Sequence, residues 1–405
     1  MPKRSELCVP FDSESYSETV ADPKMFRKQI DFVVGIHPRI FPEKITEGYE
    51  LKDIYLSKKL GIKKRRIIVD GVSYSVRPSF VLPYMASTTN LADNALFLRK
   101  FGVPFWALAH VFGKDAMHWH RMEQSLGRFS LVGTTIQKPE LLPEHISADE
   151  KHTRLRGDKA FVATTVADGC ILGVSIAEGA GNDSMVEAYS GYSNEALKVN
   201  PDYSPKTVNL DGWAPTVKAW KHLFPNVVVI LCFLHVFIKL RKIGKKKFKG
   251  YYGAIAGRLW NAYRAENRRS FGQRVRRLYE YCLSKNLSPQ IMNRIFKLKV
   301  SVGLFGVAYD HPGSHRTSNM LDRLMNMMDR HLFSMRYFHG KKQSAELGIR
   351  GWALIYNFSP SCPETRKLHS GKSCPAERLN RFRYRENWLE NLLVSASLQG
   401  IRPPP

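Results

Sequence analysis

The order of apolar segments between residues 142 and 235 constrains the fold of this chain more than any other feature. Three short β-type segments come first, and an Ala-Asp-Gly turn at 167–169 separates the second from the third. We expect strands at 145–153, 159–166, 170–177, 207–210 and 227–234, and helices at 183–197 and 214–224. Three antiparallel strands followed by alternating helices and strands predict an α/β fold around a mixed sheet.

This order of elements is that of the ribonuclease-H-like fold, and it singles out three aspartates. Asp149 lies in the first expected strand, and Asp211 directly follows the fourth. Asp322 lies on a strong helical segment at 320–336. A sheet of this kind brings the first and fourth strands together at its centre, and a later helix packed on the sheet supplies the third acid. We therefore expect the three carboxylates to converge.

Each aspartate also has a simpler interpretation. Asp211 and the glycine after it can form a strand-ending turn, Asp149 can be an exposed strand acid, and Asp322 can cap the start of its helix. Asp329 follows Asp322 by seven residues on nearly the same helix face, so spacing leaves it open as an alternative third acid. The agreement of all three positions with the element order favours a shared site.

Three converging carboxylates suit hard divalent cations. Mg²⁺ and Mn²⁺ prefer oxygen ligands, commonly one or two carboxylates together with phosphate oxygens of a substrate. Two such ions about 3.5–4 Å apart activate a water or a hydroxyl and stabilise the leaving oxygen. Asp149, Asp211 and Asp322 are thus the predicted catalytic residues and the ligands of two Mg²⁺ or Mn²⁺ ions.

The charge of the chain is strongly basic and unevenly distributed. The 405 residues contain 62 Lys and Arg against 36 Asp and Glu, a formal net charge of +26. Residues 140–235 contain 12 acids and 8 bases, so the basic excess lies outside this segment. Basic regions around a mildly acidic block predict a polyanion-binding surface around a carboxylate site, and nucleic acid is the expected partner.

Several classes of protein do not fit the sequence. The longest apolar run, at 227–234, is far shorter than the roughly 20 residues that a membrane span needs. The first 30 residues are polar and lack the apolar core of a signal peptide, and six scattered cysteines form no disulfide framework. We expect no membrane partner and a cytoplasmic, nucleoid-associated protein.

The region 51–137 is expected to bind DNA. The run SKKLGIKKRR at 57–66 is either a phosphate-tracking arm or a solvated loop, and Asp70-Gly71 after it predicts a β-hairpin. Helices expected at 91–101, 104–112 and 116–126 suit a helix-turn-helix, or alternatively a small packing bundle. The candidate DNA-binding residues here are Lys58, Lys59, Lys63, Lys64, Arg65, Arg66, His118, His120 and Arg121.

A second basic region begins at residue 236. Residues 236–277 hold 14 basic residues and a single acid, with aromatic residues between them, which predicts a helical insertion with a basic face. Lys245, Lys246 and Lys247 are its candidate DNA contacts. Trp260 either stacks on an unpaired base or packs in the core of the insertion.

Cys232 and His235 end the last expected strand of the core. The two are either packed core residues or an accessory pair, in which His235 helps to position a scissile phosphate. A zinc site with Cys362 and Cys374 can be drawn, but its spacing is not a standard one, and we do not expect zinc.

The sequence resembles the transposases of bacterial insertion sequences that carry an Asp-Asp-Glu/Asp triad. Asp149 within ADEKHT, Asp211 within NLDG, and the Thr-Ser-Asn before Asp322 in TSNMLDRLMN carry the resemblance. The string CFLH at 232–235 is similar to the Cys-x-x-His signature of Mutator-like transposases. The third acid is Asp where Glu is commoner.

The resemblance implies metal-dependent DNA strand cleavage and strand transfer at the ends of a mobile element. It implies that double-stranded DNA, as terminal inverted repeats and as target, is the partner, and that a homodimer or larger assembly pairs the two ends. The alternatives are a non-catalytic, domesticated or decayed regulator that binds DNA, and a nuclease of the same fold without strand transfer.

The expected organisation follows from these regions. The expected parts are a polar, partly ordered segment (1–50), the DNA-binding region (51–137), the first part of the core (138–235), the insertion (236–307), the core with the catalytic helix (308–360) and a C-terminal segment (361–405).

Overall fold

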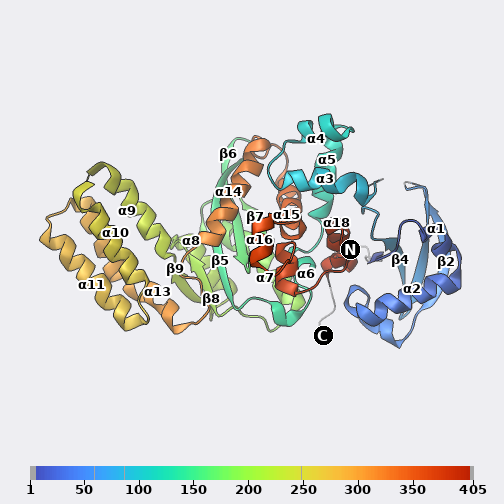
Figure 1. Ribbon diagram of the computed structural model, residues 1–405, viewed down its shortest axis with the longest axis horizontal. Coiled ribbons are helices and arrows are strands. Elements are labelled where there is room, and N and C mark those ends of the chain that lie inside the picture. Colours follow the sequence, from blue (N-terminus) through green and yellow to red (C-terminus); the bar gives the residue numbers. More distant parts are fainter. Residues whose placement is uncertain (1–5, 59, 86, 248, 402–405) are drawn as a thin grey trace.

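A computed structural model describes residues 6–58, 60–85, 87–247 and 249–401 of the chain, without the side chains of 244–249. The molecule is elongated and has three parts in a row (Figure 1). A small sheet with helices lies at one end, a larger sheet lies in the centre, and a helical bundle lies at the other end. The protein therefore belongs to the α/β class and contains two mixed sheets.

The N-terminal part is folded around a four-stranded sheet. Its strand order is β1-β4-β3-β2, with β1 parallel to β4 and the other pairs antiparallel. The elements are β1 (Glu6–Val9), α1 (Tyr16–Ala21), α2 (Pro23–Ile36), η1 (Pro38–Ile40), η2 (Glu43–Glu47), β2 (Glu50–Ser57), β3 (Ile62–Val69) and β4 (Val72–Pro78). Asp70 and Gly71 turn between β3 and β4 with φ of 48° and 68°, as a tight hairpin requires.

The expectation that residues 1–50 form a polar, partly ordered segment is wrong for the described residues. Val9, Phe26 and Ile30 are buried in the same core as the sheet, and β1 pairs along β4. The apolar residues of this segment are spaced along one face of α2, so its overall polarity hid a packed face. A boundary at residue 50 would cut through this unit.

Short helices connect the N-terminal part to the central sheet. They are α3 (Thr89–Arg99), α4 (Phe105–Phe112), α5 (Ala116–Leu126), α6 (Leu131–Thr135) and η3 (Pro139–Leu141). Helix α5 packs on α15 (Lys342–Phe358), and the contact is very close: a Cβ at Gly351 would lie 2.0 Å from the carbonyl oxygen of Glu123. Small residues at this crossing let the two helix backbones approach each other.

The central sheet has the strand order β7-β6-β5-β8-β9. Its elements are β5 (His145–Leu155), β6 (Asp158–Ala167), β7 (Cys170–Ala177), α7 (Asn182–Val199), β8 (Thr207–Leu210), α8 (Ala214–Leu223) and β9 (Val228–Leu231). The first three strands pair antiparallel, and β8 and β9 add in parallel on the other side of β5. This is the mixed sheet that the element order predicted.

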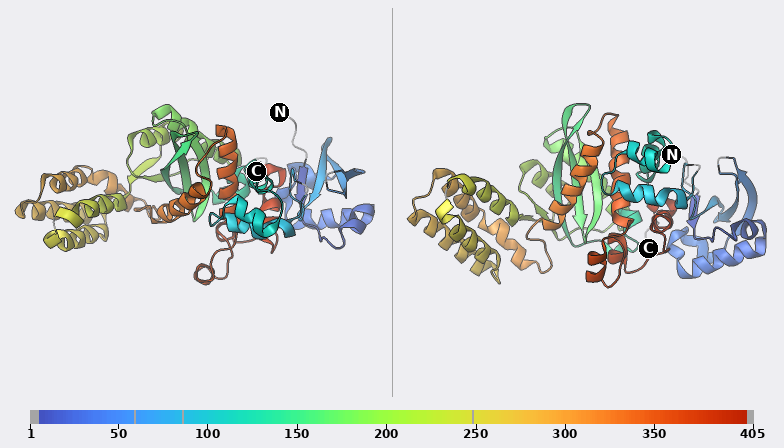
Figure 2. Two further views of the ribbon diagram at one scale, coloured as in Figure 1. Left: turned by 90° about the horizontal axis from the view of Figure 1, so that it is seen from above. Right: turned by 45° about the horizontal axis from the view of Figure 1, so that its top comes forward.

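Alternation along β6 divides the central core into two layers. Ala160, Val162 and Val166 belong to one buried cluster with α14 (Asn319–Ser334) and α15. Phe161 and Ala163 belong to the other, with residues of α7 and α8. Because successive strand residues face opposite sides, helices cover both faces of the sheet, as Figure 2 shows.

The helical bundle has a hydrophobic core of its own. It consists of α9 (Phe233–Lys247), α10 (Lys249–Tyr263), α11 (Arg268–Ser284), α12 (Pro289–Val300), α13 (Val302–Gly306) and η4 (Val307–Asp310). The strand expected at 227–234 is shorter than predicted, since helix α9 already begins at Phe233. The Phe233 ring lies 5.5 Å from Tyr263 and 5.9 Å from Phe271, so it belongs to the bundle rather than to the sheet.

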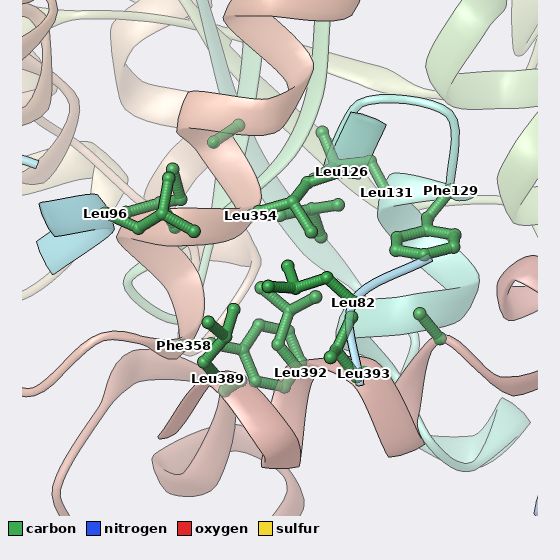
Figure 3. Close-up of a cluster of buried hydrophobic side chains, with 14 of the residues drawn as sticks. Leu82, Leu96, Leu126, Phe129, Leu131, Leu354, Phe358, Leu389, Leu392 and Leu393 are labelled. Atoms are coloured by element: carbon green, nitrogen blue, oxygen red, sulfur yellow. The ribbon is translucent and has the colours of Figure 1, made fainter. Parts of the chain in front are cut away.

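The C-terminal helices close the core between the two sheets. They are α16 (Pro363–Leu368), α17 (Pro375–Asn380), α18 (Trp388–Ser395) and η5 (Ser397–Gly400). Figure 3 shows leucines of α18 packed with Phe358 of α15 and with Leu82, Leu96 and Leu126 from the connecting region. No helix within the described residues combines the length and the apolar character needed to cross a membrane.

Candidate functional site

Asp149 in β5 and Asp211, directly after the end of the adjacent parallel strand β8, lie at the same level of the sheet. The ladder between β5 and β8 pairs Ser147 with Asn209, and each aspartate lies two residues further along. Since residues two apart in a strand face the same side, the register brings both carboxylates to one side of the sheet. The Asp211 carboxylate also accepts a hydrogen bond of 2.7 Å from the Trp213 amide, in the turn that leads into α8.

Asp322 reaches Asp149 from the first turn of α14. The two carboxylates and the His235 imidazole offer ligand atoms that all lie within 4.8 Å of one another. The structure therefore brings together two of the three expected ligands and one residue expected only as an accessory. Asp211 is not a member of this group, and neither are Cys362 and Cys374.

A short hydrogen-bonded chain holds Asp322 and His235 near each other. The Ser318 hydroxyl donates to the Asp322 carboxylate at 3.0 Å, and the Cys232 thiol donates to the Ser318 hydroxyl at 3.2 Å. Cys232 lies between β9 and α9, and His235 lies in the first turn of α9. Ser318 is the serine of the Thr-Ser-Asn string, so this motif positions the third acid through its hydroxyl.

The local charges shift the pKa values of the site. Burial raises the pKa of Asp149 to about 6, and the Asp211 and Asp322 carboxylates add to the rise. Hydrogen bonding to the Cys232 thiol raises the pKa of His235, to which the nearby Asp149 and Asp211 carboxylates contribute. A buried group of carboxylates that repel one another favours binding of a positively charged ligand.

Glu150 is a buried acid that the sequence reasoning missed. Its carboxylate accepts a hydrogen bond of 2.6 Å from the Tyr189 hydroxyl and another from the Thr216 hydroxyl. Burial raises the pKa of Glu150 to about 7. As the neighbour of Asp149 in β5, it faces the α7 and α8 side of the sheet, and strand alternation was the signal that separates the two acids.

Asp329 lines the same open groove as Asp322 but has a different partner. The groove has a volume of about 500 Å³, and Asp149, Asp322 and Asp329 are among the residues that line it. The Lys151 ammonium forms a salt bridge with the Asp329 carboxylate. Asp329 is not part of the group formed by Asp149, His235 and Asp322.

The basic run at 57–66, which spans the end of β2 and much of β3, is only partly available for DNA, which corrects the expectation for Lys64 and Arg65. Lys64 and Arg65 are buried, Lys64 in a salt bridge with Glu6 and Arg65 on the carbonyl oxygens of Val20 and Ala21. As consecutive residues of β3 the two face opposite sides of the sheet, and neighbouring elements cover both sides at this point. Arg66 forms a salt bridge with Asp53.

Two residues of this run remain exposed. The structure leaves Lys58 and Lys63 exposed at the β2–β3 turn, while Lys59 lies outside the described residues. We therefore expect phosphate contacts of this run at the β2–β3 turn and not along the whole of β3.

The three connecting helices form where the sequence predicted them, but α5 is half covered. Trp119, Met122 and Glu123 face the interior against α15. Arg121 is exposed, whereas His118 and His120 are partly buried. Only one face of α5 is therefore open to a ligand.

In the helical bundle, Trp260 packs inside the protein. Its ring is partly buried and lies 5.1 Å from Phe237 and 5.5 Å from Tyr263. Lys245, Lys246 and Lys247 belong to the last turn of α9, and their side chains lie outside the described ones.

Comparison with known proteins gives no independent assignment. No protein-family model matches the chain. The curated proteins include no significant match. The functional argument therefore rests on the residues and their geometry.

Proposed function

We propose that the protein is a DNA transposase that cleaves and joins strands at the ends of a mobile element with the help of divalent metal ions. The observation that carries the proposal is the convergence of Asp149, Asp322 and His235 within 4.8 Å, with Asp211 beside them on the next strand. These residues come from four separate elements, and no packing requirement explains a cluster of acids in a groove.

The sheet supports a ribonuclease-H-like core. Three antiparallel strands continued by two parallel ones, in the order β7-β6-β5-β8-β9, are what the element order implies for that fold. The acids lie on its central strand β5, at the end of its neighbour β8, and on α14, which packs against the sheet. A helix-turn-helix made of α3, α4 and α5 is part of the same proposal, with Arg121 on its exposed face.

The donor set fits a hard divalent cation. Carboxylate oxygens with one imidazole nitrogen suit Mg²⁺ or Mn²⁺, and a bound cation would offset the burial and the carboxylate crowding that raise the pKa of Asp149. Asp149, Asp322 and His235 would hold one ion, and Asp211 with Asp149 would help to hold a second. When bound, such ions activate a water or a 3′-hydroxyl and stabilise the leaving oxygen.

The remaining side chains of the site have positioning roles. Ser318 orients the Asp322 carboxylate, and the Trp213 amide orients that of Asp211. Lys151 lines the groove next to the acids and places a positive charge where phosphate groups would pass. Exposed basic residues of the hairpin turn and of the bundle would hold the flanking DNA.

The test uses the full chain and DNA that carries the sequences flanking its own gene. With Mg²⁺ or Mn²⁺ we expect nicked or cut ends and, with target DNA present, joined products. Asp149→Asn and Asp322→Asn should each lower cleavage at least about 100-fold, since a metal ligand contributes several kcal/mol to the transition state. Asp202→Asn, an exposed acid after α7, is the matched control and should cleave like wild type.

The outcomes separate the alternatives. Cleavage that survives both substitutions would overturn the catalytic assignment. Cleavage without joined products would indicate a nuclease of this fold, and tight DNA binding without any metal-dependent cleavage would indicate a regulator.

A further inference from the structure

The chain leaves the central sheet for the helical bundle after β9 and returns to it before α14 (Figure 1). Two members of the group formed by Asp149, His235 and Asp322 lie just after these crossings, His235 in the first turn of α9 and Asp322 in the first turn of α14. Residues 315–318 form the second crossing, between η4 and α14. The attachment of this segment therefore affects the distance between the His235 and Asp322 side chains.

Backbone groups and the Cys232 thiol fasten the segment to the start of α9. The Phe233 amide donates a hydrogen bond of 3.0 Å to the Arg316 carbonyl. The Ser318 amide donates to the Cys232 sulfur at 3.3 Å, and the Ser318 hydroxyl accepts from the same thiol at 3.2 Å. Ser318 also bonds to Asp322 twice: its hydroxyl donates at 3.0 Å, and its carbonyl accepts from the Asp322 amide at 2.7 Å. A displacement of the segment therefore moves the Asp322 carboxylate as well.

The Arg316 side chain connects the same segment to the bundle. Its Nη1 donates a hydrogen bond of 3.0 Å to the carbonyl of Tyr263, the last residue of α10. The centroids of the Tyr263 and Tyr309 rings lie 4.6 and 4.9 Å from the guanidinium carbon. The Tyr309 hydroxyl donates to the same Tyr263 carbonyl at 2.9 Å. A helix end and two aromatic rings therefore hold the guanidinium.

These contacts suit a fixed cation better than a mobile surface charge. The last carbonyls of a helix have no partner within the helix and carry partial negative charge, so they attract a cation. Aromatic rings attract a guanidinium as well, and Arg316 is half-buried, so solvent screens both attractions less than at an open surface. Replacing the guanidinium by an uncharged group would release the segment from α10 while its bonds to Phe233 and Cys232 remain.

We infer that Arg316 is a positioning residue of the metal site. By fixing the segment 315–318 to the end of α10, it holds Asp322 at the distance from Asp149 and His235 that one divalent cation requires, and it acts through the Ser318 hydroxyl. This inference rests on the proposed function and adds a residue to it. The bundle then does more than hold DNA, because the end of α10 takes part in shaping the site.

The experiment measures Mn²⁺ binding to the full chain without DNA, from the decrease of the free Mn²⁺ signal in electron paramagnetic resonance. Arg316→Met keeps the length of the side chain and its contact with the rings but removes the charge and the donor. We expect a Mn²⁺ dissociation constant about 5- to 10-fold above that of wild type, less than the roughly 10–100-fold caused by losing a residue bonded directly to a metal ligand. Arg316→Lys keeps a cation between the rings and should stay within about threefold of wild type.

A double-mutant cycle tests whether Arg316 acts through Ser318. Ser318→Ala removes the hydroxyl that bonds to Asp322 and should raise the dissociation constant about 10–100-fold. Because the link to the carboxylate is then already broken, adding Arg316→Met to Ser318→Ala should raise it by less than about twofold more. A merely structural role of Arg316 would leave the two effects independent, and they would multiply.

Arg268→Met is the matched control. Arg268 is another arginine of the bundle, and it forms an exposed salt bridge of 2.8 Å with Asp310. Its substitution leaves the segment 315–318 attached, so this variant should bind Mn²⁺ like wild type. Thermal unfolding of the metal-free variants checks the fold. If Arg316→Met does not fold, Tyr309→Leu removes one of the two rings, keeps the guanidinium, and should raise the dissociation constant about two- to fivefold.

Failure of the inference can be told apart from failure of the proposed function. If Asp322→Asn loses Mn²⁺ binding while Arg316→Met binds like wild type, or if the two effects of the cycle multiply, the positioning role is wrong and the metal site stands. An equal loss in Arg268→Met and Arg316→Met would also overturn that role. If Asp322→Asn binds Mn²⁺ like wild type, the proposed metal site is wrong, and the inference fails with it.

Discussion

Asp149 and Asp322 bring carboxylate oxygens within 4.8 Å of each other, although the whole helical bundle separates them in the chain. Asp149 comes from the centre of β5, and Asp322 comes from the first turn of α14. The bundle therefore behaves as an insertion between two parts of one site.

The two acids of α14 should differ sharply in function. Asp322→Asn removes a carboxylate of the metal group, so metal-dependent cleavage should fall at least about 100-fold and Mn²⁺ should no longer raise the unfolding temperature. Asp329→Asn breaks only the salt bridge with Lys151 and should change cleavage by less than about fivefold. Cleavage assays and thermal unfolding with and without Mn²⁺ measure both; equal losses in the two variants would contradict the assignment.

The buried Arg99–Glu123 pair should be essential for stability. Both side chains are at most 1% exposed, with the Arg99 Nε and a Glu123 oxygen 2.7 Å apart. Glu123→Ala leaves a buried guanidinium without its partner and should lower the free energy of unfolding by about 3–5 kcal/mol. In urea unfolding, Glu280→Ala, which breaks the exposed pair with Arg276, should cost less than about 1 kcal/mol. A small effect of Glu123→Ala would contradict the burial of this ion pair.

Two glycines of α15 should respond in opposite ways to alanine. A Cβ at Gly351 would lie 2.0 Å from the Glu123 carbonyl oxygen, so Gly351→Ala must push α5 away and should destabilise the protein by about 1–3 kcal/mol. A Cβ at Gly348 meets nothing within 4 Å, so Gly348→Ala should be neutral or stabilise by up to about 1 kcal/mol through helix propensity. Chemical unfolding of both variants tests this, and similar effects would argue against the close helix crossing.

Lys100 should make stability depend on pH in alkaline solution. Burial lowers its pKa from the ordinary 10.5 to about 8, while its ammonium donates to the Ser359 and Pro360 carbonyls. Between these two pH values the unfolded chain binds the proton more tightly than the folded one, so the free energy of unfolding rises with pH. Relative to Lys100→Met, wild type should gain about 3 kcal/mol from pH 8 to 10.5. Parallel unfolding curves across this range would contradict the prediction.

Much of the central fold could be predicted from the sequence because hydrophobic periodicity and turn residues are local features of the chain. The antiparallel β5, β6 and β7, the Asp-Gly hairpin and the three helices from α3 to α5 all form where periodicity and turn residues predicted them. The prediction for the N-terminal segment was wrong because the apolar residues of α2 are few and lie within a polar sequence. The predicted strand at 227–234 was too long because the apolar Phe233 packs in the bundle and not in the sheet.

For the site, the sequence by itself determined which acids stand at strand ends and helix starts, since strand alternation and element order are properties of the chain. Only the tertiary structure decided which of them meet. Packing of α14 on the sheet brings Asp322 to Asp149, pairs Asp329 with Lys151, and adds His235 from the start of α9. In the N-terminal part, contacts with Glu6 and with the end of α1 bury Lys64 and Arg65. Distances between residues remote in the chain depend on how helices and sheets pack, and no local pattern of residues encodes that packing.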